Sequence, residues 1–226
     1  EVDITGIAMP ITKCTYLVRD VNNLADTVRE AFAIARSGRP GPVLIDIVKN
    51  VTAEKAEYEP LPREEHIHSG RLANLIRRAR TSSLKMPEPN QEDVNKLVEM
   101  IAQSKKPMLI CGGGVVRSRS HEEFREFARR IDAPVAITLM GAGGIAGRDP
   151  LATGMIGMHG TQASNIACAN CDLLIAVGCR FSDRVALDPE SFASQAKIVQ
   201  IDIDRAEIDK NVKTDHHIIG DAGRVL

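Results

Sequence analysis

Short apolar segments alternate with amphipathic segments over most of the chain. Apolar residues recur at three- and four-residue steps from about residue 20 to Gly38, and a short apolar run follows at 43–48. The recurrence predicts a helix with one apolar face, and a short apolar run next to prolines predicts a buried strand. Residues 20–48 are therefore expected to form one helix–strand unit.

From residue 91 onward the same alternation repeats. The expected strands cover 108–111, 134–138, 173–177, 197–202 and 217–219, and the expected helices begin near 91, 120 and 161. The second helix is expected to open with a capping box, since Glu123 lies three residues after Ser120. Apolar strands separated by single helices are typical of a parallel sheet covered on both faces. The predicted fold class is α/β, with a doubly wound, Rossmann-like parallel sheet.

Residues 51–90 differ from both flanking regions. Four prolines interrupt a charged stretch with few β-branched residues, a composition typical of a linker. Within it, 71–78 has the spacing of a short amphipathic helix, and His66 and His68 are interpreted as surface residues. The sequence therefore predicts a first part at 1–50, a linker at 51–90 and a main domain at 91–226.

The composition is that of a globular protein with almost balanced charge. The net charge is −1, hydrophobic residues make up 43% and aromatic residues 3% of the chain. Balanced charge and few aromatic rings argue against nucleic acid as a partner, and no apolar run approaches the ~20 residues that span a bilayer. Five cysteines without a regular framework indicate free thiols in a reducing compartment. The chain starts without methionine, so we expect it to be a piece of a longer protein.

Glycines and charged residues follow several expected strands directly. They stand at Gly112–Gly114, Thr138–Gly141, Gly178–Arg180 and Asp202–Asp204. In doubly wound sheets, ligands bind beyond the carboxyl ends of the strands. Glycine lets a backbone approach a ligand closely, arginine pairs with a diphosphate, and a carboxylate accepts hydrogen bonds from ribose hydroxyls. The pattern predicts a nucleotide site at this edge of the sheet.

Two glycine motifs have structural alternatives. Gly112–Gly114 is either part of a nucleotide loop or a tight strand-to-helix turn, because Arg117 stands where a dinucleotide fingerprint has its third glycine. Gly141–Ala146 fits the fingerprint by letter, but the Asp149-Pro150 step interrupts any following helix, so we interpret it as a loop.

Other candidate residues also carry two interpretations. Cys168 and Cys171 are interpreted as two partly buried thiols, since a zinc site needs four ligands. His159, flanked by glycines, is open between a functional and a structural role. Arg180 and Arg184, on either side of Asp183, form either a surface ion pair or an anion clamp, and their place after a strand favours the clamp.

Several ordered segments together resemble the acetolactate synthase (acetohydroxyacid synthase) family. Those at 6–13 and 37–46 resemble the end of its pyrimidine-binding domain. Those at 138–141, 157–161, 180–185, 201–204 and 207–211 resemble its central domain. The resemblance covers nearly the whole chain except about 51–90. It implies a partial α/β pyrimidine-binding domain at 1–50 and a central FAD-binding domain at 91–226.

The resemblance implies a transferase that depends on thiamine diphosphate and Mg²⁺ and also carries FAD. The family decarboxylates pyruvate and condenses the product with pyruvate or 2-ketobutyrate, in branched-chain amino-acid biosynthesis. It further implies a homo-oligomer, dimer or tetramer, with a possible regulatory subunit, in the cytoplasm of a bacterial-type organism or in an organelle of a eukaryote. The alternatives are a glyoxylate carboligase-like thiamine enzyme and a non-catalytic nucleotide-binding or oligomerisation module.

The family's catalytic glutamate and its Mg²⁺-binding motif have no counterpart here, so we expect no catalytic residue and no metal site in this chain, and no activity of the chain alone. The family's FAD contacts carry over to Arg39, Gly112, Gly113, Gly114, Thr138, Leu139, Ile156, Gly157, Met158, His159, Gly178, Cys179, Arg180, Phe181, Asp183, Arg184, Asp202, Ile203 and Asp221. By this resemblance the arginines meet the diphosphate and the acids meet the sugar and adenine. Ser182 departs from the family, which usually has aspartate there.

Overall fold

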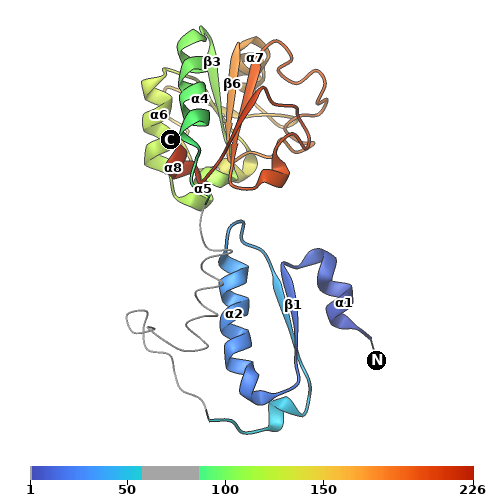
Figure 1. The fold of residues 1–226 in the computed structure, drawn as a ribbon. Coiled ribbons are helices and arrows are strands. Elements are labelled where there is room, and N and C mark those ends of the chain that lie inside the picture. The colour runs from blue at the N-terminus through green and yellow to red at the C-terminus, as the bar shows by residue number, and fades with distance from the viewer. Residues whose placement is uncertain (1, 58–86) are drawn as a thin grey trace. The chain divides into compact units, whose positions relative to one another are not determined.

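The computed structural model describes residues 2–57 and 87–226 (Figure 1). The chain divides into two compact units, which we call the N-terminal unit (residues 1–86) and the C-terminal unit (87–226). Both units are mixed α/β with parallel strands, so the predicted fold class is confirmed. Most of the expected linker at 51–90 lies outside the described residues, as do the expected helix at 71–78 and His66 and His68.

The N-terminal unit is a β-α-β arrangement. Its elements are α1 (Ile4–Ala8), β1 (Cys14–Val18), α2 (Leu24–Arg36) and β2 (Val43–Ile47), with the short 3-10 helices η1 (Met9–Ile11), η2 (Val21–Asn23) and η3 (Val51–Ala53). The strands pair in parallel, with Cys14 opposite Val43. The helix–strand unit expected at 20–48 is confirmed. The expectation that its strand is buried is wrong: every residue of β2 is at least partly exposed, because a two-stranded sheet cannot cover both of its faces.

The C-terminal unit contains a six-stranded, wholly parallel sheet in the order β5-β4-β3-β6-β7-β8. The strands are β3 (Pro107–Cys111), β4 (Val135–Ile137), β5 (Ala152–Met155), β6 (Leu173–Val177), β7 (Lys197–Asp202) and β8 (His216–Ile219). The chain winds outward from β3 to one edge and then from β6 to the other. The doubly wound, Rossmann-like sheet is therefore confirmed, with its topological switch point between β3 and β6.

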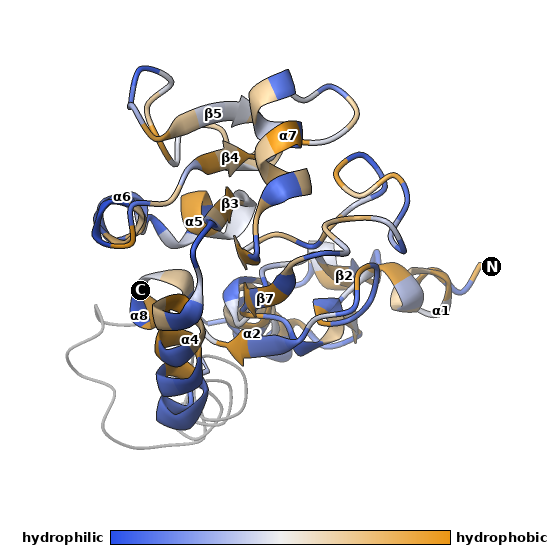
Figure 2. Cartoon of the chain, turned by 90° about the horizontal axis from the view of Figure 1, so that it is seen from above, coloured by the Kyte–Doolittle hydropathy of each residue, from blue (hydrophilic) through white to orange (hydrophobic). Residues whose placement is uncertain are grey.

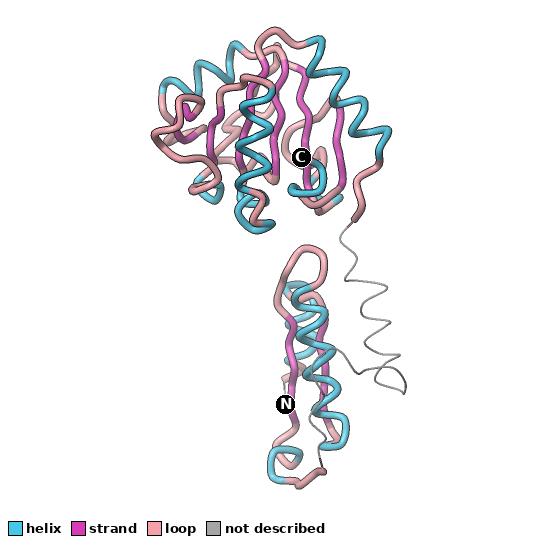
Figure 3. Tube along the Cα trace, turned by 90° about the vertical axis from the view of Figure 1, so that its left-hand side faces the viewer, coloured by secondary structure: helices cyan, strands magenta, loops and turns pink. Residues whose placement is uncertain are grey.

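Helices and loops cover both faces of this sheet (Figure 3). The helices are α4 (Gln91–Gln103), α5 (Gly113–Ser118), α6 (His121–Arg130), α7 (Gln162–Asn170) and α8 (Ala222–Val225), and η5 (Leu139–Gly141) and η6 (Arg205–Glu207) are single 3-10 turns. Successive strand side chains point to opposite faces. Leu109 accordingly packs in a core with α4, α6 and α8, whereas Ile110 packs in a second core with α7 and the loop after β6. Figure 2 shows β4 as apolar and α6 as largely hydrophilic, as expected for a helix with one face on the core.

The predicted capping box at the start of α6 is wrong. The buried Ser120 hydroxyl lies 2.6 Å from the Ser118 hydroxyl and bonds to the Val115 carbonyl, and it does not cap the helix. Arg119, in the left-handed conformation (φ 59°), ends α5 immediately before this residue. The Ser120 hydroxyl therefore bonds to a carbonyl of α5 and does not accept the expected hydrogen bond from the Glu123 amide.

Candidate functional site

The carboxyl ends of the six parallel strands meet at one edge of the C-terminal sheet, and the predicted cofactor residues of this unit gather there. They are Gly112–Gly114 after β3, Thr138 and Leu139 after β4, Ile156–His159 after β5, Gly178–Phe181 with Asp183 and Arg184 after β6, Asp202 and Ile203 at the end of β7, and Asp221 after β8. The fold therefore brings together, from six separate places in the sequence, every predicted cofactor residue except Arg39, which belongs to the N-terminal unit.

The two glycine turns at the switch point pack directly against each other. The Gly112 amide donates to the Val177 carbonyl (2.8 Å), and the Gly114 amide donates to the Gly178 carbonyl (3.0 Å). A Cβ at Gly112 would lie 2.1 Å from the Gly178 carbonyl oxygen, and a Cβ at Gly114 would lie 2.5 Å from the Gly178 Cα, so neither position has room for a side chain. Gly112 and Gly114 are therefore required by the contact between two strand ends, and this structural role accounts for two of the three glycines in the motif.

The segment interpreted as a loop, Gly141–Ala146, is confirmed as one. Residues 142–146 follow η5, whose last residue is Gly141, in turns and bends, and the Arg125 guanidinium donates to the carbonyls of Gly143 (3.2 Å) and Gly144 (3.1 Å). Cys168 and Cys171, interpreted as partly buried thiols, are free, and the structure has both of them buried. Burial raises the pKa of Cys168 to about 11 and, together with the charge of Cys168, that of Cys171 to about 12, so both thiols are protonated at neutral pH.

The loop after β5 is joined to the loop after β6. The Met158 amide donates to the Arg184 carbonyl (2.9 Å). Gly157 has a φ of +97°, and a Cβ there would lie 2.1 Å from the same carbonyl oxygen. The glycine is needed both for its backbone conformation and for this close contact. The contact brings exposed His159 onto the same edge as Arg184.

The side chains of the predicted cofactor residues differ in their access to solvent. The buried residues among them are Cys179, Phe181, Ile156 and Thr138, none of which is more than 8% exposed. Burial also raises the pKa of Cys179 to about 11. Leu139 is 76% and Met158 48% exposed, and Met140 and Leu187, which the sequence did not single out, are also exposed apolar side chains in the loops of this edge. An apolar, accessible rim suits a flat ring system.

The charged side chains at this edge comprise exposed arginines and carboxylates held in turns. The Arg184 Nε lies 3.4 Å from Asp183 Oδ2, and both side chains are strongly exposed. An exposed ion pair of this kind contributes little, so Arg184 can exchange it for an anionic ligand. Among the described residues, no hydrogen bond or ion pair engages the Arg180 guanidinium. Asp202 Oδ1 accepts from the Asp204 amide (3.0 Å), which fixes that carboxylate at the end of β7.

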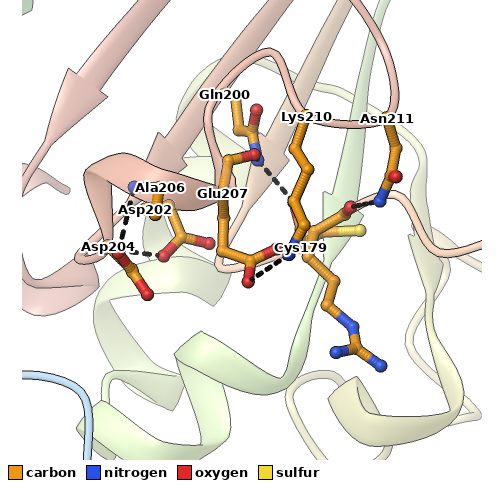
Figure 4. Close-up of polar contacts among 9 residues, drawn as sticks. Cys179, Gln200, Asp202, Asp204, Ala206, Glu207, Lys210 and Asn211 are labelled. Atoms are coloured by element: carbon orange, nitrogen blue, oxygen red, sulfur yellow. Dashed lines mark hydrogen bonds and ion pairs between the residues drawn. The ribbon is translucent and has the colours of Figure 1, made fainter. Parts of the chain in front are cut away.

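Buried Gln200 was missed by the sequence analysis. It lies in the middle of β7, and its side-chain amide donates to the carbonyls of Cys179 (3.1 Å) and Glu207 (3.2 Å) (Figure 4). The Asn211 side-chain amide donates to the Arg180 carbonyl (3.0 Å). A polar residue within an apolar strand was the available signal, but its partners are distant in sequence and could not be named.

Arg39 lies in the turn between α2 and β2 of the N-terminal unit. The Lys13 ammonium donates to the main-chain carbonyls of Ile34 (2.8 Å), Ser37 (2.6 Å) and Arg39 (3.2 Å). Partial burial lowers the pKa of Lys13. Gly38, with a φ of +48°, allows the chain to leave the helix. Lys13 thus joins the carboxyl end of α2 to the turn that carries Arg39.

Comparison with known proteins gives consistent similarities. A model of the thiamine pyrophosphate enzyme central domain matches residues 94–226. Over its full length the chain is 43% identical to a probable acetolactate synthase large subunit of Methanocaldococcus jannaschii, 43% to the acetolactate synthase large subunit of Parasynechococcus marenigrum and 40% to that of Corynebacterium glutamicum. It covers 36%, 35% and 34% of these proteins, respectively. The chain therefore spans about a third of the length of the curated relatives it matches.

Proposed function

Because this chain belongs to the thiamine pyrophosphate enzymes through their central domain, we propose that its C-terminal unit is the FAD-binding domain of an acetolactate synthase large subunit. The observation that carries the proposal is the gathering of the predicted FAD contacts at one edge of the sheet. Nucleotides bind at this edge in doubly wound folds. The similarity to acetolactate synthase large subunits along the whole chain supports the same proposal.

The residues at this edge fit the chemistry of FAD. Exposed Arg180 and Arg184 would meet the diphosphate, since guanidinium groups bind phosphate oxygens with paired donors. The exposed side chains of Leu139 and Met158 would pack against the isoalloxazine ring. Asp202, fixed at the end of β7, would accept hydrogen bonds from the adenosine portion. When bound, FAD supplies a flat isoalloxazine ring and the negative charges of its diphosphate. The reaction of the family involves no net oxidation or reduction of this cofactor.

The parent enzyme, in this proposal, condenses two 2-ketoacids with loss of CO₂, as a step of branched-chain amino-acid biosynthesis. Thiamine diphosphate and Mg²⁺ supply the chemistry of decarboxylation and are held outside this chain. The parent is a homo-oligomer with a possible regulatory subunit, in the cytoplasm or in an organelle. Residues 1–50 form part of its pyrimidine-binding domain. No helix among the described residues has the length and apolar character needed to cross a membrane.

The proposed cofactor is tested by titrating the 226-residue chain with FAD, ADP and NAD and following each by equilibrium dialysis. We expect FAD to bind more tightly than ADP or NAD, and Arg184→Ala to weaken FAD binding. Arg130→Ala is the matched control, since Arg130 is also exposed and paired with an acid, Glu126 (2.5 Å), at the far end of α6. Tighter binding of NAD or ADP, or equal affinities of the two variants, would favour a different nucleotide-binding module.

The proposal that this chain binds FAD but holds neither thiamine diphosphate nor Mg²⁺ is tested by the activity of the chain alone. Because thiamine diphosphate and Mg²⁺ are held outside it, we expect no acetolactate from pyruvate, with or without these cofactors. Measurable turnover by the isolated chain would contradict this assignment. Comparing pyruvate with glyoxylate as substrates of the parent enzyme separates acetolactate synthase from the glyoxylate carboligase alternative.

A further inference from the structure

We propose that Gln200 and Asn211 are positioning residues for Arg180. The inference rests on the proposed function, because it concerns how the FAD site holds its arginine. The carbonyls of Cys179 and Arg180 are consecutive, and each accepts a hydrogen bond from a side-chain amide, of Gln200 (3.1 Å) and Asn211 (3.0 Å), respectively (Figure 4). Two successive peptide groups of one turn are thereby fixed from outside the turn.

The turn needs this support because its backbone is strained. Gly178 has a φ of +60° and Phe181 a φ of +49°. A large side chain is uncommon in the left-handed region, and such residues persist where the surrounding structure determines them. The Phe181 ring is buried and meets the Phe192 ring edge-on, at 5.7 Å between centroids. At the other end of the turn, Gly114 packs against Gly178. The turn is therefore anchored at both ends and held by the two amides between them.

Gln200 also connects the turn to the segment after β7. Its amide bonds to the Glu207 carbonyl (3.2 Å), and the Glu207 carboxylate pairs with Lys210 (3.2 Å), which directly precedes Asn211. A fully buried amide within an apolar strand is unfavourable unless it is hydrogen-bonded. The Gln200 Nε2 donor meets this requirement by bonding to the Cys179 and Glu207 carbonyls, whereas its buried Oε1 has no hydrogen-bond partner among the described residues. The hydrogen bonds that hold the turn at Arg180 thus come from β7 and from residues 207–211.

The consequence concerns the direction of a single exposed side chain. With its neighbouring carbonyls fixed, the Cα–Cβ bond of Arg180 has one direction, and this residue is exposed just after β6. A preorganised arginine loses less conformational freedom when it meets an anion. Without the Asn211 amide the turn can relax, and we expect FAD to bind about tenfold more weakly, as for the loss of one precisely aimed charged contact.

The experiment uses the 226-residue chain with Asn211→Ala and Asn211→Asp, which both remove the donor at an exposed position. The matched control is Asn170→Ala. Asn170 is also exposed and donates one side-chain bond to a main-chain carbonyl, that of Ile166 (2.8 Å), at the end of α7. Gln200→Glu is a second variant at the buried position. FAD affinity, thermal unfolding and hydrogen exchange of residues 181–186 are measured, and Asn211→Ala is repeated in an Arg180→Ala background.

A positioning role predicts that Asn211→Ala weakens FAD binding about tenfold in the wild-type background and has no further effect once Arg180 is removed. Equal weakening in both backgrounds, or none in either, overturns the inference. The amides of Val185 and Ala186, which bond to the Ser182 carbonyl, should exchange faster in Asn211→Ala and not in Asn170→Ala. If the wild-type chain rejects FAD, the proposed function fails, and hydrogen exchange alone then decides: unchanged exchange overturns the positioning role.

Discussion

The N-terminal and C-terminal units share the same β-α-β arrangement but bury their apolar side chains to very different extents. In the N-terminal unit the described residues form only a two-stranded sheet, and Phe32 is 66% and Leu17 43% exposed. In the C-terminal unit six strands lie between two layers, and Phe124 is fully buried. Both phenylalanines lie on apolar faces of amphipathic helices. The comparison shows that a helical pattern fixes which face is apolar, whereas the number of neighbouring layers decides whether that face is covered.

The two units also hold their candidate arginines differently. An ammonium group, that of Lys13, fixes the turn that carries Arg39. Side-chain amides, of Gln200 and Asn211, fix the turn that carries Arg180. Both sets bond to main-chain carbonyls, but Gln200 is fully buried and Lys13 is largely exposed to solvent. Hydrogen bonds that exclude water fix geometry more firmly, so the C-terminal turn is expected to be the more rigid of the two.

The largest expected difference comes from truncating the two phenylalanines. Phe124→Ala should destabilise the C-terminal unit by about 3–5 kcal/mol, because it opens a cavity in a closed core. Phe32→Ala should change the stability of the N-terminal unit by less than about 0.5 kcal/mol, since the ring is mostly in water. Urea unfolding followed by hydrogen exchange of peptides from each unit measures both. Similar losses for the two variants would contradict the contrast in burial.

Two glycines with positive φ provide the next comparison. Gly178→Ala should destabilise its unit by more than about 2 kcal/mol, because strain and overlap with the Gly114 backbone add. Gly38→Ala should destabilise by only about 1 kcal/mol, since Gly38 has a φ of +48° but no atom within 4 Å of the added Cβ. Thermal unfolding of both variants tests this. A cost at Gly38 as large as that at Gly178 would mean that steric overlap is not decisive.

The buried thiols predict that the stability of the C-terminal unit depends on pH in the alkaline range. Burial raises the pKa of Cys111 to about 12 and of Cys179 to about 11, from an ordinary value of 9.0. The folded state therefore holds these protons more tightly, so their contribution to stability is complete below about pH 9 and is lost as the pH rises toward 11 and 12. Urea midpoints at pH 8 and pH 10.5 should show a fall for this unit.

Labelling the native thiols checks the same contrast at neutral pH. A thiol reagent should modify half-exposed Cys14 rapidly and the other four cysteines only after unfolding. Rapid labelling of Cys168 or Cys171 in the folded chain would show that the second core is open, and the pH prediction would then lose its basis.

The smallest expected effect is at Lys13. Lys13→Met should destabilise the N-terminal unit by about 1 kcal/mol, because three carbonyls at the end of α2 lose a common donor in a partly solvated place. The C-terminal unit should be unaffected. Lys105→Met, at an exposed lysine of the other unit, is the control. Hydrogen exchange at residues 34–41 reports the change, and an unaltered exchange rate would show that Lys13 does not hold this turn.

The sequence predicted the elements whose signals are local and strong. Strands β3, β6 and β7 were predicted almost residue by residue, since the apolar runs of β3 and β6, and the mostly apolar centre of β7, can be recognised without their partners. Strand β5 was missed, because Ala152–Met155 contains a glycine and only one β-branched residue. Strand β1 was also missed; it lies between Lys13 and the charged pair Arg19-Asp20. The capping box failed at Ser120, whose hydroxyl bonds to α5.

The candidate site followed from the same local signals. Once the strands are parallel, the residues after them must share an edge, so Arg180 and Asp202 could be placed together without a structure. The roles of Gln200, Asn211 and the Gly114–Gly178 contact depend on pairs that are distant in sequence and meet only in the folded chain. Burial of the Phe181 ring was likewise invisible, because the sequence does not show which face of a loop meets the core.

The central claim, that the carboxyl edge of the C-terminal sheet binds FAD, is tested most directly by a visible absorption spectrum. The 226-residue chain is incubated with FAD, passed through gel filtration and compared with Arg180→Ala and with Arg130→Ala. We predict that the wild type and Arg130→Ala retain a flavin spectrum and that Arg180→Ala loses it. A wild-type chain that emerges colourless, or an Arg180→Ala chain that keeps the full flavin spectrum, would contradict the claim.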